Sequence, residues 1–322
     1  MHIPATSAVL ASGSTEITPV NPEVSRPGAS FLTPGAYALE EPGPASAIFE
    51  SALQSSTEPR NPAVDAQINS GSGVNVDLSD RCVLITGAGS GIGRACAIRL
   101  SAAGARPILL DRDDAAVRST AQECGGEPMT VDLSDPDVID SLGLDADIVV
   151  NNAGFQTVAA IEDFPPDRFA AMVRVMLEAP FRIVRAVLPA MYKRGYGRIV
   201  NISSVHGHRA SPYKAAYVAA KHGLEGLSKV IALEGGPRGV TSNTVCPAYV
   251  RTPLVEGQIA DQARTHGIDA EQVVRNIMLT QPAIKRLIEP EEVAEVVAFL
   301  CTQQASFVNG AAIVMDGGWT AR

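Results

Sequence analysis

The chain has 322 residues, a formal net charge of −9 at pH 7 and 46% hydrophobic residues. This acidic balance, without a run of lysine and arginine or a long apolar span, argues against a nucleic-acid surface and a membrane crossing. The five cysteines are odd in number and widely spaced, which favours reduced thiols and a cytoplasmic protein over a disulfide framework.

Residues 1–75 differ in kind from the remainder. They are rich in Pro, Ser, Ala and Gly, contain no lysine and show no sustained hydrophobic period, a composition that predicts a disordered tail. The segment resembles neither a secretory signal nor an Arg-rich transit peptide. Two interpretations stay open: a mis-assigned start, or a tail that binds a partner through Phe31-Leu32 and Ala47-Ile48-Phe49.

Residues 76–322 are long enough for one α/β domain, and their alternating strands and helices predict a doubly wound, Rossmann-like parallel sheet. The expected strands are Cys82–Thr86, Arg106–Leu110 ending in Asp111, one that ends at Asp132, Ile148–Asn151, Arg198–Ile202, Val240–Cys246 and Ala312–Met315. The expected helices are one after Gly93, Asp113–Cys124, Asp167–Lys193 with an interruption at Pro180, Tyr213–Gly235 and Glu289–Thr302. Residues 253–282 are interpreted as an insertion that closes over a ligand.

The first strand leads into a glycine-rich turn, Gly87-Ala88-Gly89-Ser90-Gly91-Ile92-Gly93. Glycines in this order allow a tight turn and a close approach of the backbone to a pyrophosphate, which then faces the helix N-terminus. The second strand ends in Asp111, where a carboxylate would accept hydrogen bonds from an adenosine ribose and repel a 2′-phosphate. The pattern predicts NAD rather than NADP, although an arginine at the adjacent position, Arg112, can pair with a 2′-phosphate.

Tyr217 and Lys221 are four residues apart, so both side chains lie on one face of the expected helix. A nearby ammonium stabilises a phenolate, and a serine hydroxyl such as that of Ser204 can hold a substrate oxygen. A lone pair of this kind is more often part of an ordinary amphipathic helix. Here it follows a nucleotide-binding turn, which favours proton transfer.

The ordered motifs resemble those of the short-chain dehydrogenase/reductase family, over about residues 76 to 322: the glycine turn, Asn151-Asn152-Ala153-Gly154, Ser204, Tyr217 and Lys221. The resemblance implies that Ser204, Tyr217 and Lys221 are catalytic, and it implies a homotetramer. It places at the NAD site Gly87, Gly91, Ile92, Gly93, Asp111, Asp132, Asn152, Ala153, Gly154, Tyr217, Lys221, Pro247, Val250 and Thr252.

Further residues match the substrate pocket of D-3-hydroxybutyrate dehydrogenases within that family: Gln156, His206, Lys214, Gln258 and Trp319. Two amides, an imidazole and an ammonium suit a small carboxylate, and the tryptophan would close the pocket. Taken singly, Lys214 and Gln258 would be solvated surface residues, and Trp319 a core or interface residue. Together with Ser204 and Tyr217 they imply reversible, NAD-dependent oxidation of (R)-3-hydroxybutyrate to acetoacetate.

One residue departs from the family pattern: Met176 stands where an asparagine usually helps to hold a water of the proton relay, and a thioether cannot supply its donors. Two other functions stay open. A 3-oxoacyl thioester reductase of the same fold is disfavoured by Asp111 and Lys214, and a non-catalytic NAD-binding protein is favoured only by Met176. His206 and His208 form an HxH pair, but no further ligands lie near them in the sequence, so we predict no metal.

Overall fold

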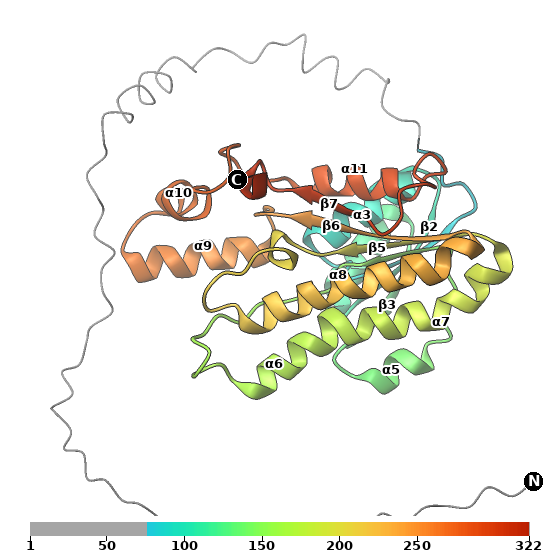
Figure 1. Ribbon diagram of the computed structural model, residues 1–322, viewed down its shortest axis with the longest axis horizontal. Coiled ribbons are helices and arrows are strands. Elements are labelled where there is room, and N and C mark those ends of the chain that lie inside the picture. Colours follow the sequence, from blue (N-terminus) through green and yellow to red (C-terminus); the bar gives the residue numbers. More distant parts are fainter. Residues whose placement is uncertain (1–75, 322) are drawn as a thin grey trace, which may run out of the picture. The chain divides into compact units, whose positions relative to one another are not determined.

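The computed structural model describes residues 76–321, except for the side chains of Asp261 and Thr265, and the predicted tail lies outside the described residues. Seven parallel strands form one sheet in the order β3-β2-β1-β4-β5-β6-β7 (Figure 1). They are β1 (Cys82–Thr86), β2 (Arg106–Asp111), β3 (Glu127–Thr130), β4 (Ile148–Asn151), β5 (Gly197–Ile202), β6 (Val240–Pro247) and β7 (Ala312–Met315). The predicted doubly wound class is confirmed. Its strand order reverses between β1 and β4, where open α/β sheets bind ligands.

Helices cover both faces of the sheet. They are α3 (Gly91–Ala102), α4 (Asp114–Cys124), α5 (Pro136–Ser141), α6 (Pro166–Val173), α7 (Ala179–Arg194), α8 (Ala215–Gly235), α9 (Pro253–His266), α10 (Ala270–Val273) and α11 (Pro290–Leu300). Short 3-10 segments are η2 (Val205–Gly207), η3 (Gly236–Arg238) and η5 (Trp319–Ala321), and π-helical turns are η1 (Arg174–Glu178) and η4 (Val274–Met278).

Alternate side chains of each strand enter opposite cores, as the two-residue period of a strand requires. Val83 and Ile85 pack in the cluster that α3, α4 and α11 cover. Leu84, between them, packs in the cluster that α5 and α7 cover. Figure 1 shows α11 on one side of the sheet and α7 and α8 on the other. The sheet is therefore buried on both faces, which fits its nearly unbroken apolar strands.

Two strand and helix boundaries near the ligand edge differ from expectation. The third strand ends at Thr130 rather than Asp132, because the Asp132 carboxylate accepts the Ser134 amide at 2.9 Å and closes a turn there. Helix α8 begins at Ala215 rather than Tyr213, because Tyr213 has a φ of 66°, in the left-handed region that no helix residue adopts. Both corrections leave the predicted site residues at the carboxyl ends of the strands.

The predicted interruption of the long helix is a π-helical turn that precedes Pro180. The Ala179 amide donates to the Arg174 carbonyl, five residues earlier. In a regular α-helix the proline ring would clash with the carbonyl four residues before it, which is that of Met176. The wider turn η1 accommodates the ring, and the helix then continues without a break into α7.

The insertion folds as α9, α10 and η4 around a small apolar cluster of its own, which contains Val255, Ile259, Val273, Met278 and Leu279. The cysteines are all free thiols, as expected. Among the described residues, no helix has the length and apolar character that a membrane crossing needs.

Candidate active site

The turn between β1 and α3 leaves no room for a side chain at its glycine positions. Gly87 and Gly91 have φ angles of 64° and 52°, which favour glycine. A Cβ on Gly93 would lie 2.1 Å from the Gly87 carbonyl oxygen. Asn152 fixes the turn from β4, because its Nδ2 donates to the carbonyls of Thr86 and Gly87 at 2.9 and 3.1 Å. The turn is a rigid cradle at a helix N-terminus, which fits a pyrophosphate.

A cleft of about 500 Å³ opens above this turn at the carboxyl edge of the sheet, within the size range of ligand sites. Every predicted NAD-site residue lines it except Gly93, which lies behind the turn: Gly87, Gly91, Ile92, Asp111, Asp132, Asn152, Ala153, Gly154, Tyr217, Lys221, Pro247, Val250 and Thr252. Ser204 lines the same cleft. The residues present therefore fit a dinucleotide, with its phosphates at the turn.

Two carboxylates mark one end of the cleft. Asp111 accepts the Gly89 amide at 2.9 Å and the Asp113 amide at 3.1 Å, which holds its side chain in place at the end of β2. The Ser134 amide and hydroxyl, with a smaller contribution from the charge of Arg112, hold the pKa of Asp132 below its ordinary value. This end of the cleft is negative, although Arg112 also lines it.

The three candidate catalytic residues come from two neighbouring elements. Ser204 follows β5 and is the N-cap of η2, where its Oγ accepts the His206 amide at 3.2 Å. Tyr217 and Lys221 lie one turn apart on α8, and the Lys221 Nζ is 5.6 Å from the centre of the tyrosine ring. Lys221 is buried and donates to the Ile202 carbonyl at 2.7 Å. The structure thus brings the serine, tyrosine and lysine to one wall of the cleft.

Burial dominates the electrostatics of this wall. It lowers the pKa of Lys221 to about 8, against the opposing charges of Cys246 and Glu225. Burial also raises the pKa of Tyr217, and a hydrogen bond with Ser204 acts in the opposite direction. Desolvation of the phenolate outweighs this hydrogen bond, and the lowering of the Tyr217 pKa by Lys221 stays a prediction.

Three aromatic rings and a lysine form a chain of contacts that begins at the candidate catalytic tyrosine. The His206 ring lies 6.0 Å from Tyr217 and 5.9 Å from Trp319, edge to face in both pairs. Trp319 stacks on Tyr249 at 5.9 Å, and the Lys214 Nζ is 5.9 Å from the centre of the Tyr249 ring. Burial, with a smaller effect of the Lys214 charge, lowers the pKa of His206 to about 4. The imidazole is therefore neutral at pH 7.

The two predicted glutamines contact each other, one from the insertion and one from the loop after β4. Gln258 of α9 donates from Nε2 to the Gln156 Oε1 at 3.3 Å. The Gln156 Nε2 is buried and has no hydrogen-bond partner among the described residues. A buried amide group without a partner is costly, so this group is a candidate donor to a ligand.

Met176 is buried in the π-turn η1, in an apolar cluster with Phe164, Met172 and two alanines of α8. Tyr217 packs against the same cluster. The position that the family fills with a polar amide is therefore part of a small apolar core under the catalytic helix. The backbone carbonyl of Ile202 is the polar partner that the structure gives to Lys221.

Sequence reasoning missed several residues of this region. The motif around Pro247 places Tyr249 beside a cofactor, whereas it lies between Lys214 and Trp319. Ser211, whose Oγ lies 2.9 Å from the His206 Nε2, carries no pattern that marks it. The HxH spacing pairs His208 with His206, whereas the structure places it against Glu225 and Cys246, residues remote from it in the sequence.

Comparison with known proteins follows the same motifs. Residues 87–320 match a family model described as enoyl-(acyl carrier protein) reductase. The chain is 44% identical over 256 residues to the D-beta-hydroxybutyrate dehydrogenase of Rhizobium meliloti (strain 1021), covering 75% of this chain and 99% of that one. It is 34% identical over 247 residues to the acetoacetyl-CoA reductase of Shinella zoogloeoides, covering 74% and 98%.

Solved structures agree in fold. A putative NAD(P)-dependent gluconate 5-dehydrogenase from Beutenbergia cavernae, with NADP bound at low occupancy, superposes with a TM-score of 0.68 and 35% sequence identity. The match covers 77% of this chain and 100% of that one.

Proposed function

The chain belongs to the short-chain dehydrogenase/reductase family of oxidoreductases, and within it we propose reversible, NAD-dependent oxidation of (R)-3-hydroxybutyrate to acetoacetate. The observation that carries the substrate class is the buried Gln156 Nε2, which has no partner in the part of the chain that the structure describes. A carboxylate oxygen would satisfy this donor, and a second amide, Gln258, lies beside it. The identity to a D-beta-hydroxybutyrate dehydrogenase supports the same substrate.

Lys214 supplies the charge that a small carboxylate requires. Burial lowers the pKa of its ammonium, and an anion placed next to it would favour the charged form. His206, neutral at pH 7, offers a hydrogen bond rather than a charge, and the Trp319 ring, stacked on Tyr249, lies against it as an apolar neighbour. Binding the remote carboxylate would fix C3 of the substrate, so loss of the clamp should lower kcat as well as raise KM.

In the proposed reaction Tyr217 first loses its own proton to solvent, and its phenolate oxygen then accepts the hydroxyl proton of the substrate, while the Ser204 Oγ holds the substrate oxygen. Bound NAD would supply the acceptor for the hydride of C3. Lys221, held by the Ile202 carbonyl at 2.7 Å, keeps a positive charge on the tyrosine side of the cleft. In the reverse direction Tyr217 returns the proton as an acid. NAD is preferred because Asp111 and Asp132 line the end of the cleft where a 2′-phosphate would lie.

The proposal is tested by NADH formation by the purified full chain with (R)- or (S)-3-hydroxybutyrate, with NADP in place of NAD, and with an acetoacetyl thioester plus NADPH. We expect turnover only with the (R)-acid and NAD. A thioester-only activity would replace the proposal with the reductase alternative, for which the acetoacetyl-CoA reductase relative is the precedent. Activity on none of them would favour the binding-protein alternative.

A matched pair of lysine variants separates the clamp from a general effect of charge. Lys214→Met should raise KM for the acid and lower kcat, because it removes the ammonium from the pocket. Lys229→Met, at an exposed position of α8, should leave both constants unchanged. Equal effects of the two substitutions would contradict the clamp.

We propose that backbone and water complete the proton relay that an asparagine at position 176 would usually support. Lys221 already has a backbone partner in Ile202, and the Met176 side chain is surrounded by apolar groups. Met176→Asn should therefore give little or no gain in turnover. A large gain in kcat would show instead that the methionine weakens the relay.

We also propose a cytoplasmic homotetramer. Phe181 of α7 and Val230 and Leu233 of α8 are large apolar side chains that are exposed, and their burial in an interface would favour self-association. Sedimentation equilibrium of the purified chain tests the tetramer, and a monomer at micromolar concentration would refute it.

A further inference from the structure

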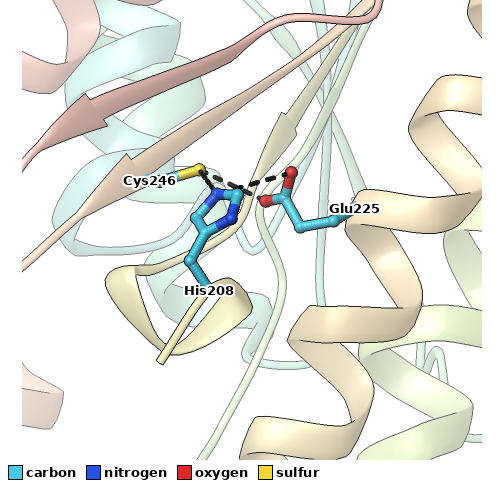
Figure 2. Close-up of side chains that lie close together, drawn as sticks. All are labelled: His208, Glu225 and Cys246. Atoms are coloured by element: carbon cyan, nitrogen blue, oxygen red, sulfur yellow. Dashed lines mark hydrogen bonds and ion pairs between the residues drawn. The ribbon is translucent and has the colours of Figure 1, made fainter. Parts of the chain in front are cut away.

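Three side chains with metal-binding atoms lie close together (Figure 2). His208 follows η2, Glu225 lies on α8 and Cys246 lies on β6. The Cys246 Sγ is 3.6 Å from the His208 Nε2 and 3.2 Å from one Glu225 oxygen, and the other oxygen is 3.8 Å from the same nitrogen. None of these three residues has a part in the proposed reaction.

The separation of the Cys246 sulfur and the His208 nitrogen matches the ligand spacing of a tetrahedral zinc ion. Zinc lies about 2.3 Å from a thiolate sulfur and about 2.0–2.2 Å from nitrogen or oxygen ligands. At tetrahedral angles, those bond lengths put neighbouring ligand atoms roughly 3.4–3.6 Å apart. The Sγ–Nε2 separation of 3.6 Å lies in that range, and the Glu225 carboxylate lies against both atoms through its two oxygens, at 3.2 Å from the sulfur and 3.8 Å from the nitrogen. One ligand atom from each of the three residues lies within 4.8 Å of the other two, so a cation requires side-chain adjustments to bind all three.

The chemistry of the three groups also suits a divalent cation. Sulfur, imidazole nitrogen and carboxylate oxygen are together the ligand types of zinc. A thiolate and a carboxylate would neutralise the two positive charges of the ion. Glu225 and Cys246 are buried, at 5% and 0% exposure, whereas the His208 side chain is 34% exposed, which gives an ion a path from solvent.

We propose that His208, Glu225 and Cys246 form a binding site for a thiophilic divalent cation of the zinc type. The fourth position falls to water or to the Thr244 hydroxyl, which now donates to the Glu225 carboxylate at 2.8 Å. Coordination replaces the proton on the Cys246 sulfur, which leaves to solvent, and uses the neutral form of His208. The site does not rest on the proposed substrate or reaction. It differs from the sequence-based expectation of no metal, which considered only neighbours of His208 in the sequence.

Cobalt(II) titration of the purified, chelator-treated full chain tests the site, because tetrahedral cobalt bound to a thiolate gives a charge-transfer absorption that oxygen and nitrogen ligands alone do not. We expect wild type to show this absorption, zinc to abolish it by competition, and His208→Ala to weaken cobalt binding by at least about tenfold. His222→Ala, which removes an exposed histidine of α8, should bind as wild type does.

Two further variants test whether Glu225 is a ligand and whether a cysteine outside the cluster binds the cobalt instead. Glu225→Gln preserves the size of the buried side chain, so it should weaken cobalt binding while its circular dichroism spectrum stays that of wild type. Cys124→Ser, at a thiol outside the cluster, should leave the absorption unchanged. The proposal is overturned if wild type gives no thiolate absorption, if His208→Ala binds cobalt as tightly as wild type does, or if the absorption disappears in Cys124→Ser.

Discussion

Gly93→Ala should destabilise the fold and abolish dinucleotide binding. The new Cβ would lie 2.1 Å from the Gly87 carbonyl oxygen and 2.6 Å from the Asn152 Nδ2, whereas non-bonded heavy atoms prefer about 3.5 Å. The turn must therefore move by more than about 1 Å. Overpacking of this kind costs about 1–3 kcal/mol. The two Asn152 hydrogen bonds to the turn add about 1 kcal/mol each if they break.

The helix propensity of alanine returns up to about 1 kcal/mol, so the net loss of unfolding free energy should be roughly 2–4 kcal/mol. Gly226→Ala is the matched control: a Cβ at this position inside α8 would have no neighbouring atom of the described residues within 4 Å, and the substitution should stabilise the protein by about 0.4–1 kcal/mol. Urea unfolding followed by circular dichroism measures both, and NADH fluorescence measures binding. If Gly93→Ala lowers the unfolding free energy by less than about 1 kcal/mol and binds NADH normally, the cradle argument fails.

Three further outcomes test the wall of the cleft. Tyr217→Phe should lower kcat by about 10²–10⁴-fold while NADH binding stays unchanged, and an unchanged kcat in initial-rate assays would exclude the tyrosine from proton transfer. Burial depresses the folded-state pKa of His206 from 6.5 to about 4. Its contribution to stability is therefore fully present above pH 6.5 and is lost as pH falls toward 4, by at most roughly 3 kcal/mol. Urea unfolding of wild type and His206→Asn at pH 7 and 4.5 should show this difference, and parallel pH profiles of the two proteins would refute it. Asp111→Asn keeps an acceptor for the Gly89 amide but removes a negative charge. The ratio of kcat/KM with NADP to kcat/KM with NAD should therefore rise about tenfold. A constant ratio would show that Asp111 does not select the cofactor.

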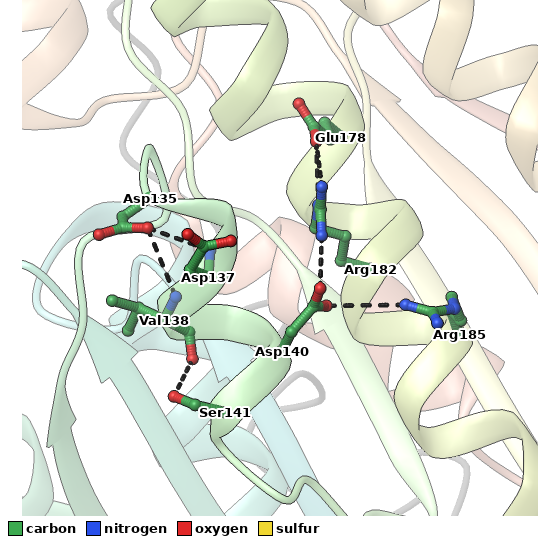
Figure 3. A network of polar contacts seen from close by, with 8 residues as sticks. All are labelled: Asp135, Asp137, Val138, Asp140, Ser141, Glu178, Arg182 and Arg185. Atoms are coloured by element: carbon green, nitrogen blue, oxygen red, sulfur yellow. Dashed lines mark hydrogen bonds and ion pairs between the residues drawn. The ribbon is translucent and has the colours of Figure 1, made fainter.

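The sequence predicts the strands and the ligand edge of this fold well, because each depends on local chemistry. An apolar run followed by glycines identifies β1 and the turn, and the spacing of Tyr217 and Lys221 places both on one face of α8. Short elements held by tertiary contacts are harder. In the sequence, only a capping aspartate and a proline indicate helix α5. Tertiary contacts help to position it: Arg182 of α7 donates to Asp140 of α5 at 2.6 Å and also to Glu178 (Figure 3).

The state of the catalytic groups is not predictable from spacing, because burial decides it. Four residues of separation put Lys221 beside Tyr217, yet desolvation raises the pKa of the phenol and lowers that of the ammonium. The π-turn at Met176 is a further case. Pro180 signals a disturbance, but whether the helix breaks, kinks or widens depends on how the segment packs under α8.

Helix α8 connects the candidate active site with the proposed metal site. Tyr217, Lys221 and Glu225 follow one another at single-turn intervals, so one helical face carries a proton-transfer group, its cation and a buried carboxylate. The first two face the cleft, and the third faces His208 and Cys246. On β6, Cys246 directly precedes Pro247, whose carbonyl lies 3.4 Å from the Ser204 Oγ. A cation held by Glu225 and Cys246 would thus bind to the same helix and strand that position the catalytic lysine and serine, which places the proposed metal site where it can alter the charge around Lys221.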